Sequence, residues 1–143
     1  MRVLIVHPNR IIQIALSHLV NSFADFRVTA TMNNCAQTMD YLARSEERID
    51  LILIDPSNIA SGAITSLVGM TAAKIMLIAN DDSMVEIDGW VREGARGILG
   101  PSADVEQFEK ALQKVCQGEY WLNRDLTSRI LNSLSHAQEL TDR

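Results

Sequence analysis

Short apolar runs with almost no polar residues inside them are the feature that most constrains how this chain can fold. Four such runs occupy residues 3–6, 51–54, 75–78 and 97–99, and a fifth segment, residues 26–32, alternates in part between apolar and polar residues. Strands that are apolar on both faces are those of parallel sheets that helices cover on each side. The runs therefore predict the five strands of a parallel sheet.

Helical periodicity follows each predicted strand. The first pattern spans residues 10–23 and places four apolar side chains on one face, namely Ile12, Ala15, Leu16 and Leu19. Further patterns span residues 35–44, 59–70, 83–93 and 104–117, and a glycine follows each of the last two as a C-terminal cap. This repeated order predicts an α/β fold, a flavodoxin-like doubly wound five-stranded parallel sheet with strand order 2-1-3-4-5.

The chain divides into one domain and an extension. Residues 1–118 contain the five βα units, and residues 119–143 are predicted to form a C-terminal helical extension in which Leu126, Ile130, Leu131 and Leu134 have helical spacing. No stretch approaches the roughly 18 uninterrupted apolar residues of a membrane helix. No signal-peptide pattern is visible, and the two cysteines have no metal-type spacing. We therefore expect a cytoplasmic protein with free thiols and no membrane contact.

Charge and motif content narrow the possible functions. The net charge is −5 and no cluster of lysine or arginine occurs, so this segment is a poor candidate for binding nucleic acid by itself. Residues 7–10 read His-Pro-Asn-Arg where a dinucleotide-binding domain has its glycine-rich turn, and the chain has neither a P-loop nor a Gly-x-Ser-x-Gly motif. We expect no enzymatic activity, although a small flavodoxin-like enzyme or cofactor binder remains an alternative.

Several segments resemble the receiver domain of bacterial response regulators. The matching segments are residues 2–6, 50–55 and 94–99, together with Gly118-Glu119-Tyr120-Trp121-Leu122 after the last helix. The closest likeness is to receivers that precede a LuxR-type helix-turn-helix domain, because residues 139–143 also resemble the opening of that DNA-binding domain. The resemblance implies that the chain continues into such a domain beyond Arg143. A stand-alone adaptor whose tail matches by chance is the alternative.

The resemblance assigns a chemical role to Asp55. In this family the aspartate after the third strand accepts a phosphoryl group, a carboxylate pair after the first strand helps to hold Mg²⁺, and a hydroxyl and a lysine bind the phosphoryl oxygens. Such groups are needed because the transferring phosphoryl group carries negative charge on its equatorial oxygens. Asp55 ends an apolar run at the carboxyl edge of the sheet, where a phosphoacceptor would stand.

The other positions of the family pattern are changed. His7 and Pro8 replace the carboxylate pair, Ala79 replaces the hydroxyl residue and Pro101 replaces the lysine. Ile98 stands at the aromatic switch position. Proline has no side-chain ligand, and imidazole is a poor ligand for Mg²⁺, which prefers oxygen. We therefore expect no metal and no cofactor, with Mg²⁺ required only if the chain is a conventional receiver.

Loss of these groups predicts a receiver that is not phosphorylated at useful rates. Removing one oxyanion donor typically lowers the rate by a factor of about 10² to 10³. Losing the metal site, hydroxyl and lysine together should remove most of the catalytic rate enhancement. Asp55 would then be a vestigial acid that caps the following loop, a working phosphoacceptor, or part of another ligand's site. An imidazole–carboxylate pair between His7 and Asp55 could imitate the phosphorylated or metal-bound state. A metal site that also uses Asp81 and Asp82 is a weaker alternative.

The segment Trp121-Leu122-Asn123-Arg124 has two interpretations. It is similar to a tetrapeptide with which a few atypical LuxR-type regulators bind cyclic di-GMP, where the arginine can stack on guanine or pair with phosphate and the indole supplies an apolar wall. Asn123 departs from that pattern, which has threonine or serine. The alternative is that Trp121 packs the extension onto the last helix.

The sequence as a whole predicts a regulatory receiver module that acts on a C-terminal DNA-binding domain. Control would come from dimerisation or from a ligand or partner, without conventional phosphorylation of Asp55. The expected partners are a second copy in a homodimer, a sensor kinase or another regulatory protein, and DNA through the C-terminal domain.

Overall fold

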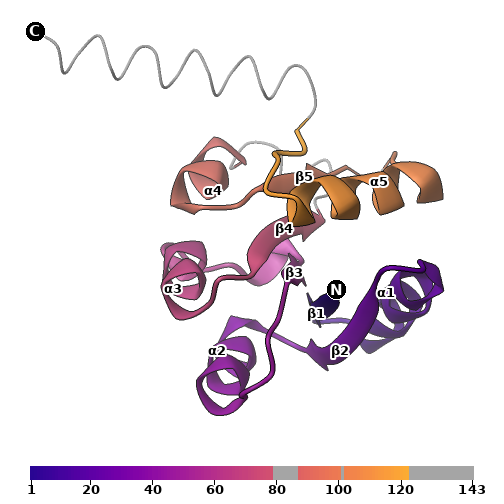
Figure 1. Cartoon of the computed structure of the whole chain (residues 1–143). Coiled ribbons are helices and arrows are strands. Elements are labelled where there is room, and N and C mark those ends of the chain that lie inside the picture. Colours follow the sequence, from indigo (N-terminus) through magenta and orange to yellow (C-terminus); the bar gives the residue numbers. More distant parts are fainter. Residues whose placement is uncertain (79–86, 101, 123–143) are drawn as a thin grey trace, which may run out of the picture.

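The protein forms a five-stranded parallel sheet with the order β2-β1-β3-β4-β5, in a computed structural model that describes residues 1–78, 87–100 and 102–122 (Figure 1). The strands are β1 Arg2–Val6, β2 Arg27–Met32, β3 Leu51–Ile54, β4 Lys74–Ile78 and β5 Gly97–Leu99. The helices are α1 Arg10–Ser22, α2 Cys35–Arg44, the 3₁₀ turn η1 Pro56–Asn58, α3 Ala63–Met70, α4 Ile87–Glu93 and α5 Val105–Cys116. The fold class and the strand order predicted from the sequence are confirmed.

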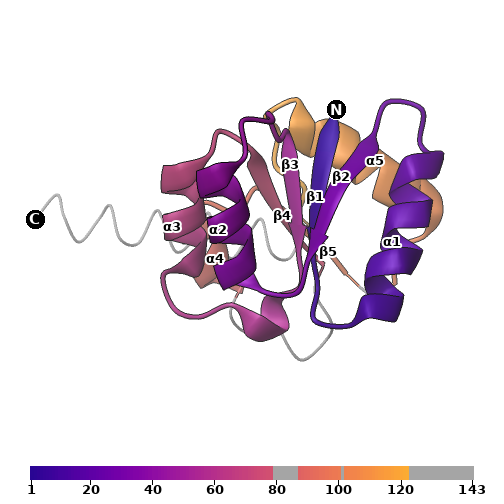
Figure 2. The same ribbon diagram turned by 90° about the horizontal axis from the view of Figure 1, so that it is seen from below.

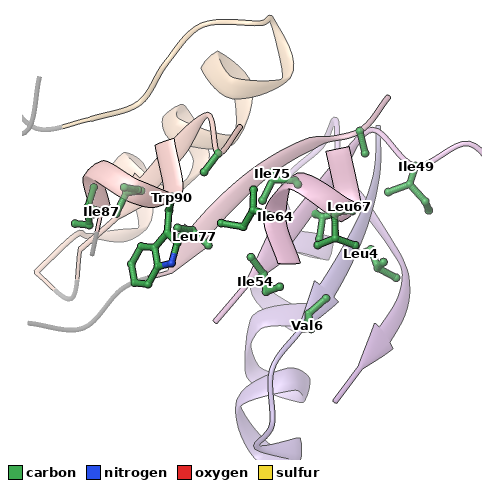
Figure 3. Close-up of a cluster of buried hydrophobic side chains, with 14 residues drawn as sticks. Leu4, Val6, Ile49, Ile54, Ile64, Leu67, Ile75, Leu77, Ile87 and Trp90 are labelled. Carbon is green, nitrogen blue, oxygen red and sulfur yellow. The ribbon is translucent and has the colours of Figure 1, made fainter. Parts of the chain in front are cut away.

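Helices cover both faces of the sheet. In Figures 1 and 2, α2, α3 and α4 lie on one side, and α1 and α5 lie on the other. Alternate strand residues therefore enter two separate cores. The α2–α4 core includes Leu4, Val6, Ile54, Ile64, Leu67, Ile75, Leu77, Ile87 and Trp90 (Figure 3). The α1/α5 core includes Val3, Ile5, Val20, Leu53, Met76, Phe108, Leu112 and Val115. This explains why the strands are apolar on both faces.

The buried face of α1 differs from the one that the apolar pattern predicts. Ala15 is exposed and Ile12 is 39% exposed, whereas Gln13 is 2% exposed and Val20 is fully buried. Leu16 and Leu19 are partly buried against the α1/α5 core. The face is rotated because Gln13 makes polar contacts with the ends of two strands, which counting apolar residues does not detect.

Side-chain caps set the limits of several helices. Asn9 and Asn34 cap α1 and α2, and Asp104 forms a reciprocal capping box with Gln107 at the start of α5. The predicted helix over residues 59–70 is shorter than expected, because Pro56 begins a 3₁₀ turn and α3 begins only after Gly62. Within the described helices, none is long and apolar enough to cross a membrane.

Candidate functional site

The site lies at the carboxyl edge of the sheet, where β1 and β3 end side by side. Val6 and Ile54 are paired in the parallel register, and the N–H of Asp55 donates to the carbonyl of Val6 over 2.9 Å. On the other side of β1, the N–H of His7 donates to the carbonyl of Met32 over 3.0 Å. These backbone bonds place the first residue after each central strand at the same edge, where ligand sites occur in sheets of this type.

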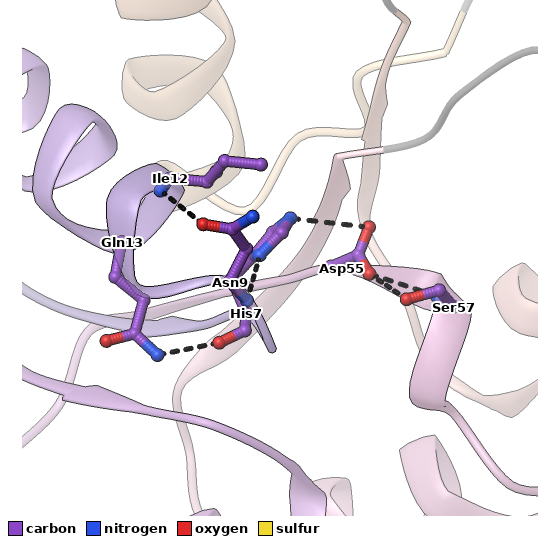
Figure 4. Close-up of polar contacts among 6 residues, drawn as sticks. All are labelled: His7, Asn9, Ile12, Gln13, Asp55 and Ser57. Atoms are coloured by element: carbon purple, nitrogen blue, oxygen red, sulfur yellow. Dashed lines mark hydrogen bonds and ion pairs between the residues drawn. The ribbon is translucent and has the colours of Figure 1, made fainter.

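His7 and Asp55 face each other across this edge (Figure 4). The Nε2 atom of His7 lies 3.9 Å from Oδ1 of Asp55, and both side chains are 14% exposed. That distance is within ion-pair range but longer than a hydrogen bond. The predicted proximity of the two residues is therefore observed, in a partly buried setting where charges are less screened than on the open surface.

A hydrogen bond from the backbone determines which ring nitrogen of His7 carries the proton. The N–H of Asn9 donates to Nδ1 of His7 over 3.0 Å. A nitrogen that accepts a hydrogen bond carries no proton, so the neutral ring has its proton on Nε2. The Nε2–H group therefore lies on the side of Asp55, and His7 presents a positive edge to the carboxylate even when the imidazole is uncharged.

The second oxygen of Asp55 is engaged by Ser57. Oδ2 accepts a hydrogen bond from the backbone N–H of Ser57 over 3.3 Å and another from its hydroxyl. Asp55 is the N-cap of η1, so this contact is a local one that the Asp-Pro-Ser sequence favours. Ser57 was not predicted as a site residue. Its position two residues after an aspartate was the available signal.

Gln13 holds the backbone of His7 in place from the first helix. Its Nε2 atom lies 2.7 Å from the carbonyl of His7, 3.2 Å from the carbonyl of Met32 and 2.7 Å from Oδ1 of Asn33. The same side chain thus ties the ends of β1 and β2 together beneath the site, and Figure 4 shows its contact with His7. A buried amide of this kind resists movement of His7, because breaking it would leave polar groups unpaired.

The described residues do not fit a Mg²⁺ site. Among them, no group of three or more His, Cys, Asp or Glu residues could hold a metal ion. Pro8 is exposed and offers no ligand, and Ile98 is buried in the α2–α4 core. Ala79, Pro101, Asp81 and Asp82 lie outside the described residues.

Trp121 packs the start of the C-terminal extension onto the sheet. The N–H of Trp121 donates to the carbonyl of Arg96 over 3.0 Å, and the N–H of Ile98 donates to the carbonyl of Trp121 over 2.9 Å. Trp121 packs against the α1/α5 core and Leu122 packs against the α2–α4 core, as successive residues of a strand would. The indole therefore has a structural contact. Arg124 lies outside the described residues, as does the predicted helical pattern over residues 126–134.

Comparison with solved structures identifies the fold. The chain resembles a LuxR-family DNA-binding response regulator from Silicibacter pomeroyi, with 25% identity over 87% of this chain and 98% of that one and a TM-score of 0.74. A LuxR-family two-component response regulator from an Aurantimonas species has 16% identity over 94% and 97% of the two chains and a TM-score of 0.77. RcsB from Salmonella enterica serovar Typhimurium, bound to promoter DNA with the phosphomimetic BeF3⁻, has 13% identity over 96% and 69% and a TM-score of 0.74.

The chain therefore has the fold of the receiver domains of response regulators. The structural neighbours include LuxR-family response regulators, as the sequence resemblance predicts. No model of a known protein family matches the sequence, and no curated protein matches it either.

Proposed function

We propose that this receiver domain regulates its target without phosphorylation of Asp55. The observation that carries the proposal is that groups of the protein lie against both carboxylate oxygens. Oδ1 faces Nε2 of His7, and Oδ2 accepts hydrogen bonds from the backbone and the hydroxyl of Ser57. A phosphoacceptor needs one oxygen free to attack phosphorus and the other free to bind the metal.

The electrostatics of the edge also oppose phosphoryl transfer. That reaction depends on a metal ion and donors already aimed at the phosphoryl oxygens. The loop after β1 supplies His7 and Pro8 there, so the carboxylates that would bind Mg²⁺ are missing from it. One lost donor already costs about 10² to 10³ in rate. We infer that Asp55 reacts too slowly to carry a signal.

In this proposal the pair of His7 and Asp55 is a resident substitute for the metal or phosphoryl group. The imidazole edge faces the carboxylate and the backbone of Asn9 holds the ring. The site would therefore keep one conformation without binding a metal ion and without phosphorylation. The domain would be a cytoplasmic module without enzymatic activity, controlled by dimerisation or by binding a ligand or partner protein. It would act on a DNA-binding domain that follows Arg143.

Chemical labelling tests the proposal. The purified protein would be incubated with Mg²⁺ and acetyl phosphate, and intact mass spectrometry would measure addition of one phosphoryl group. We expect no stoichiometric addition. Stoichiometric labelling that disappears in Asp55→Asn, with both proteins folded by circular dichroism, would overturn the proposal and identify a conventional receiver.

A double variant tests whether His7 and Pro8 make phosphorylation of Asp55 slow. Replacing His7 and Pro8 together, as His7→Glu with Pro8→Asp, restores a carboxylate pair beside Asp55. If the first strand is one source of the inactivity, this variant should be labelled faster than the wild type, with Asp55→Asn in the same background as control. Equal labelling rates would contradict the assigned role of His7 and Pro8.

A further inference from the structure

A groove beside the Asp55 site runs between α1 and β2 and shares Gln13 with that site. It has a volume of about 260 Å³, and its lining residues are Arg10, Gln13, Ile14, Ser17, His18, Asn21 and Thr31. Six of the seven come from one side of α1, and Thr31 comes from the edge strand β2. Figures 1 and 2 show α1 lying alongside this edge of the sheet. Since the lining extends from the first to the last turn of the helix, the groove is elongated.

The groove has an arginine and no acidic residue in its lining, although the chain is acidic. The whole sequence has 18 acidic and 13 basic residues, yet α1 contains no aspartate or glutamate and the groove is lined by Arg10 and His18. Within the described part of the chain, neither side chain has an acidic group within ion-pair distance. Arg10 also lies in the first turn of α1, where the helix dipole is positive. The groove therefore favours a negatively charged ligand.

The spacing of three groove residues matches an extended peptide. Arg10, Ile14 and His18 follow at intervals of four residues along α1, which corresponds to about 6 Å of rise per step. Alternate residues of an extended strand are spaced by about 6.6 Å. A peptide lying along the groove would thus place every second side chain opposite one of these three residues. Ile14, whose side chain is 50% exposed, lies midway between Arg10 and His18 along the helix.

We propose that this groove binds an extended segment of a partner protein with the pattern acidic-x-apolar-x-acidic. The two carboxylates would meet the Arg10 guanidinium and the His18 imidazole, and the apolar side chain would cover Ile14. Asn21 uses its Oδ1 atom to accept the N–H of Val28 over 2.8 Å, so its Nδ2 group is the donor that it offers to a peptide carbonyl. Main-chain contacts at a strand edge with alternate side chains in a groove are an established mode of peptide recognition.

A single-stranded nucleic acid fits the same residues less well. Its phosphates follow one another closely, so one of them would lie against the apolar Ile14 side chain. A chain with a net charge of −5 also repels a polyanion.

The proposal does not depend on Asp55, and its test leaves the phosphorylation chemistry unchanged.

Fluorescence anisotropy with a defined peptide tests the proposal. The probe is fluorescein-labelled Thr-Asp-Thr-Val-Thr-Asp-Thr, titrated with the full chain. We expect saturable binding that weakens about 10-fold in Arg10→Gln, since charge-assisted hydrogen bonds are stronger than neutral ones. Arg92→Gln removes the same charge from an exposed position on α4 and should change binding less than about 2-fold. Ile14→Asp should also weaken binding.

Three results would overturn the proposal. The first is no saturable binding of the peptide at protein concentrations up to about 1 mM, the weak limit of specific recognition. The second is an equal loss of affinity in Arg10→Gln and Arg92→Gln, which would show only a general charge effect. The third is binding of labelled oligothymidylate with the same dependence on Arg10 while the peptide fails to bind. Circular dichroism of each variant shows that the fold is retained.

Discussion

Replacing Gln13 with leucine tests the structural account of the candidate site. A count of apolar residues along α1 treats Gln13 as a polar residue outside the core, so the substitution would be neutral or stabilising. The structure makes the opposite prediction, because Gln13 is 2% exposed and its amide contacts the ends of β1 and β2. Gln13→Leu removes the donor and leaves the size of the side chain nearly unchanged.

The expected loss of folding stability follows from the acceptors that lose a hydrogen-bond partner. The carbonyl of His7 and Oδ1 of Asn33 each lose a contact of 2.7 Å, while the carbonyl of Met32 keeps the N–H of His7. Asn33 is exposed and its Oδ1 can bond water instead, so the main cost comes from the partly buried carbonyl of His7. An unpaired buried acceptor costs about 1–3 kcal/mol. Burial of the leucine side chain offsets part of that cost, by about 1 kcal/mol. The net destabilisation should be about 1 kcal/mol.

Urea denaturation followed by circular dichroism measures this change. Gln13→Leu should lower the midpoint without changing the slope, and the melting temperature should fall by about 3–5 °C. Ile11→Gln is the matched control on the same helix. Ile11 is 78% exposed, so its substitution should stay within about 0.5 kcal/mol. Wild-type or higher stability of Gln13→Leu would refute the reasoning.

Three further predictions concern β5 and α5. Gly97→Ala should destabilise the protein by about 1–3 kcal/mol in urea denaturation, because the new Cβ would lie 2.7 Å from Cγ2 of Val115. Asp104→Ala should cost about 1 kcal/mol by the same measurement, since it removes the capping box with Gln107. Burial, more than any other cause, raises the pKa of the Cys116 thiol from 9.0 to about 11. The unfolded thiol therefore loses its proton first, and stability measured across a pH series should decrease between about pH 9 and 11.

The strands and their order could be predicted because both faces of the sheet are covered. A strand that is buried on both faces is a continuous apolar run, as in residues 51–54. Such a run can be recognised in a single sequence. Helix ends with a side-chain cap were also predictable, as Asp104 at the start of α5 shows.

The details of the site could be predicted only in part. That His7 and Asp55 lie close together follows from parallel strands ending at one edge. Three contacts depend on three-dimensional packing or local turn geometry instead. They are the hydrogen bond from Asn9 to His7, the support from Gln13 and the engagement of Asp55 by Ser57. Periodicity shows which residues are apolar, but it does not show which polar side chain meets a strand end.

The central claim is that Asp55 does not bind a phosphoryl group, and beryllofluoride binding tests it most directly. Two-dimensional NMR spectra of isotopically labelled protein would be recorded with Mg²⁺ alone and after addition of beryllofluoride. The account predicts unchanged amide signals for Asp55, Ser57 and His7. Saturable, Mg²⁺-dependent shifts of these signals that vanish in Asp55→Asn would contradict it, because they would show that His7 and Ser57 yield the carboxylate to a phosphoryl analogue.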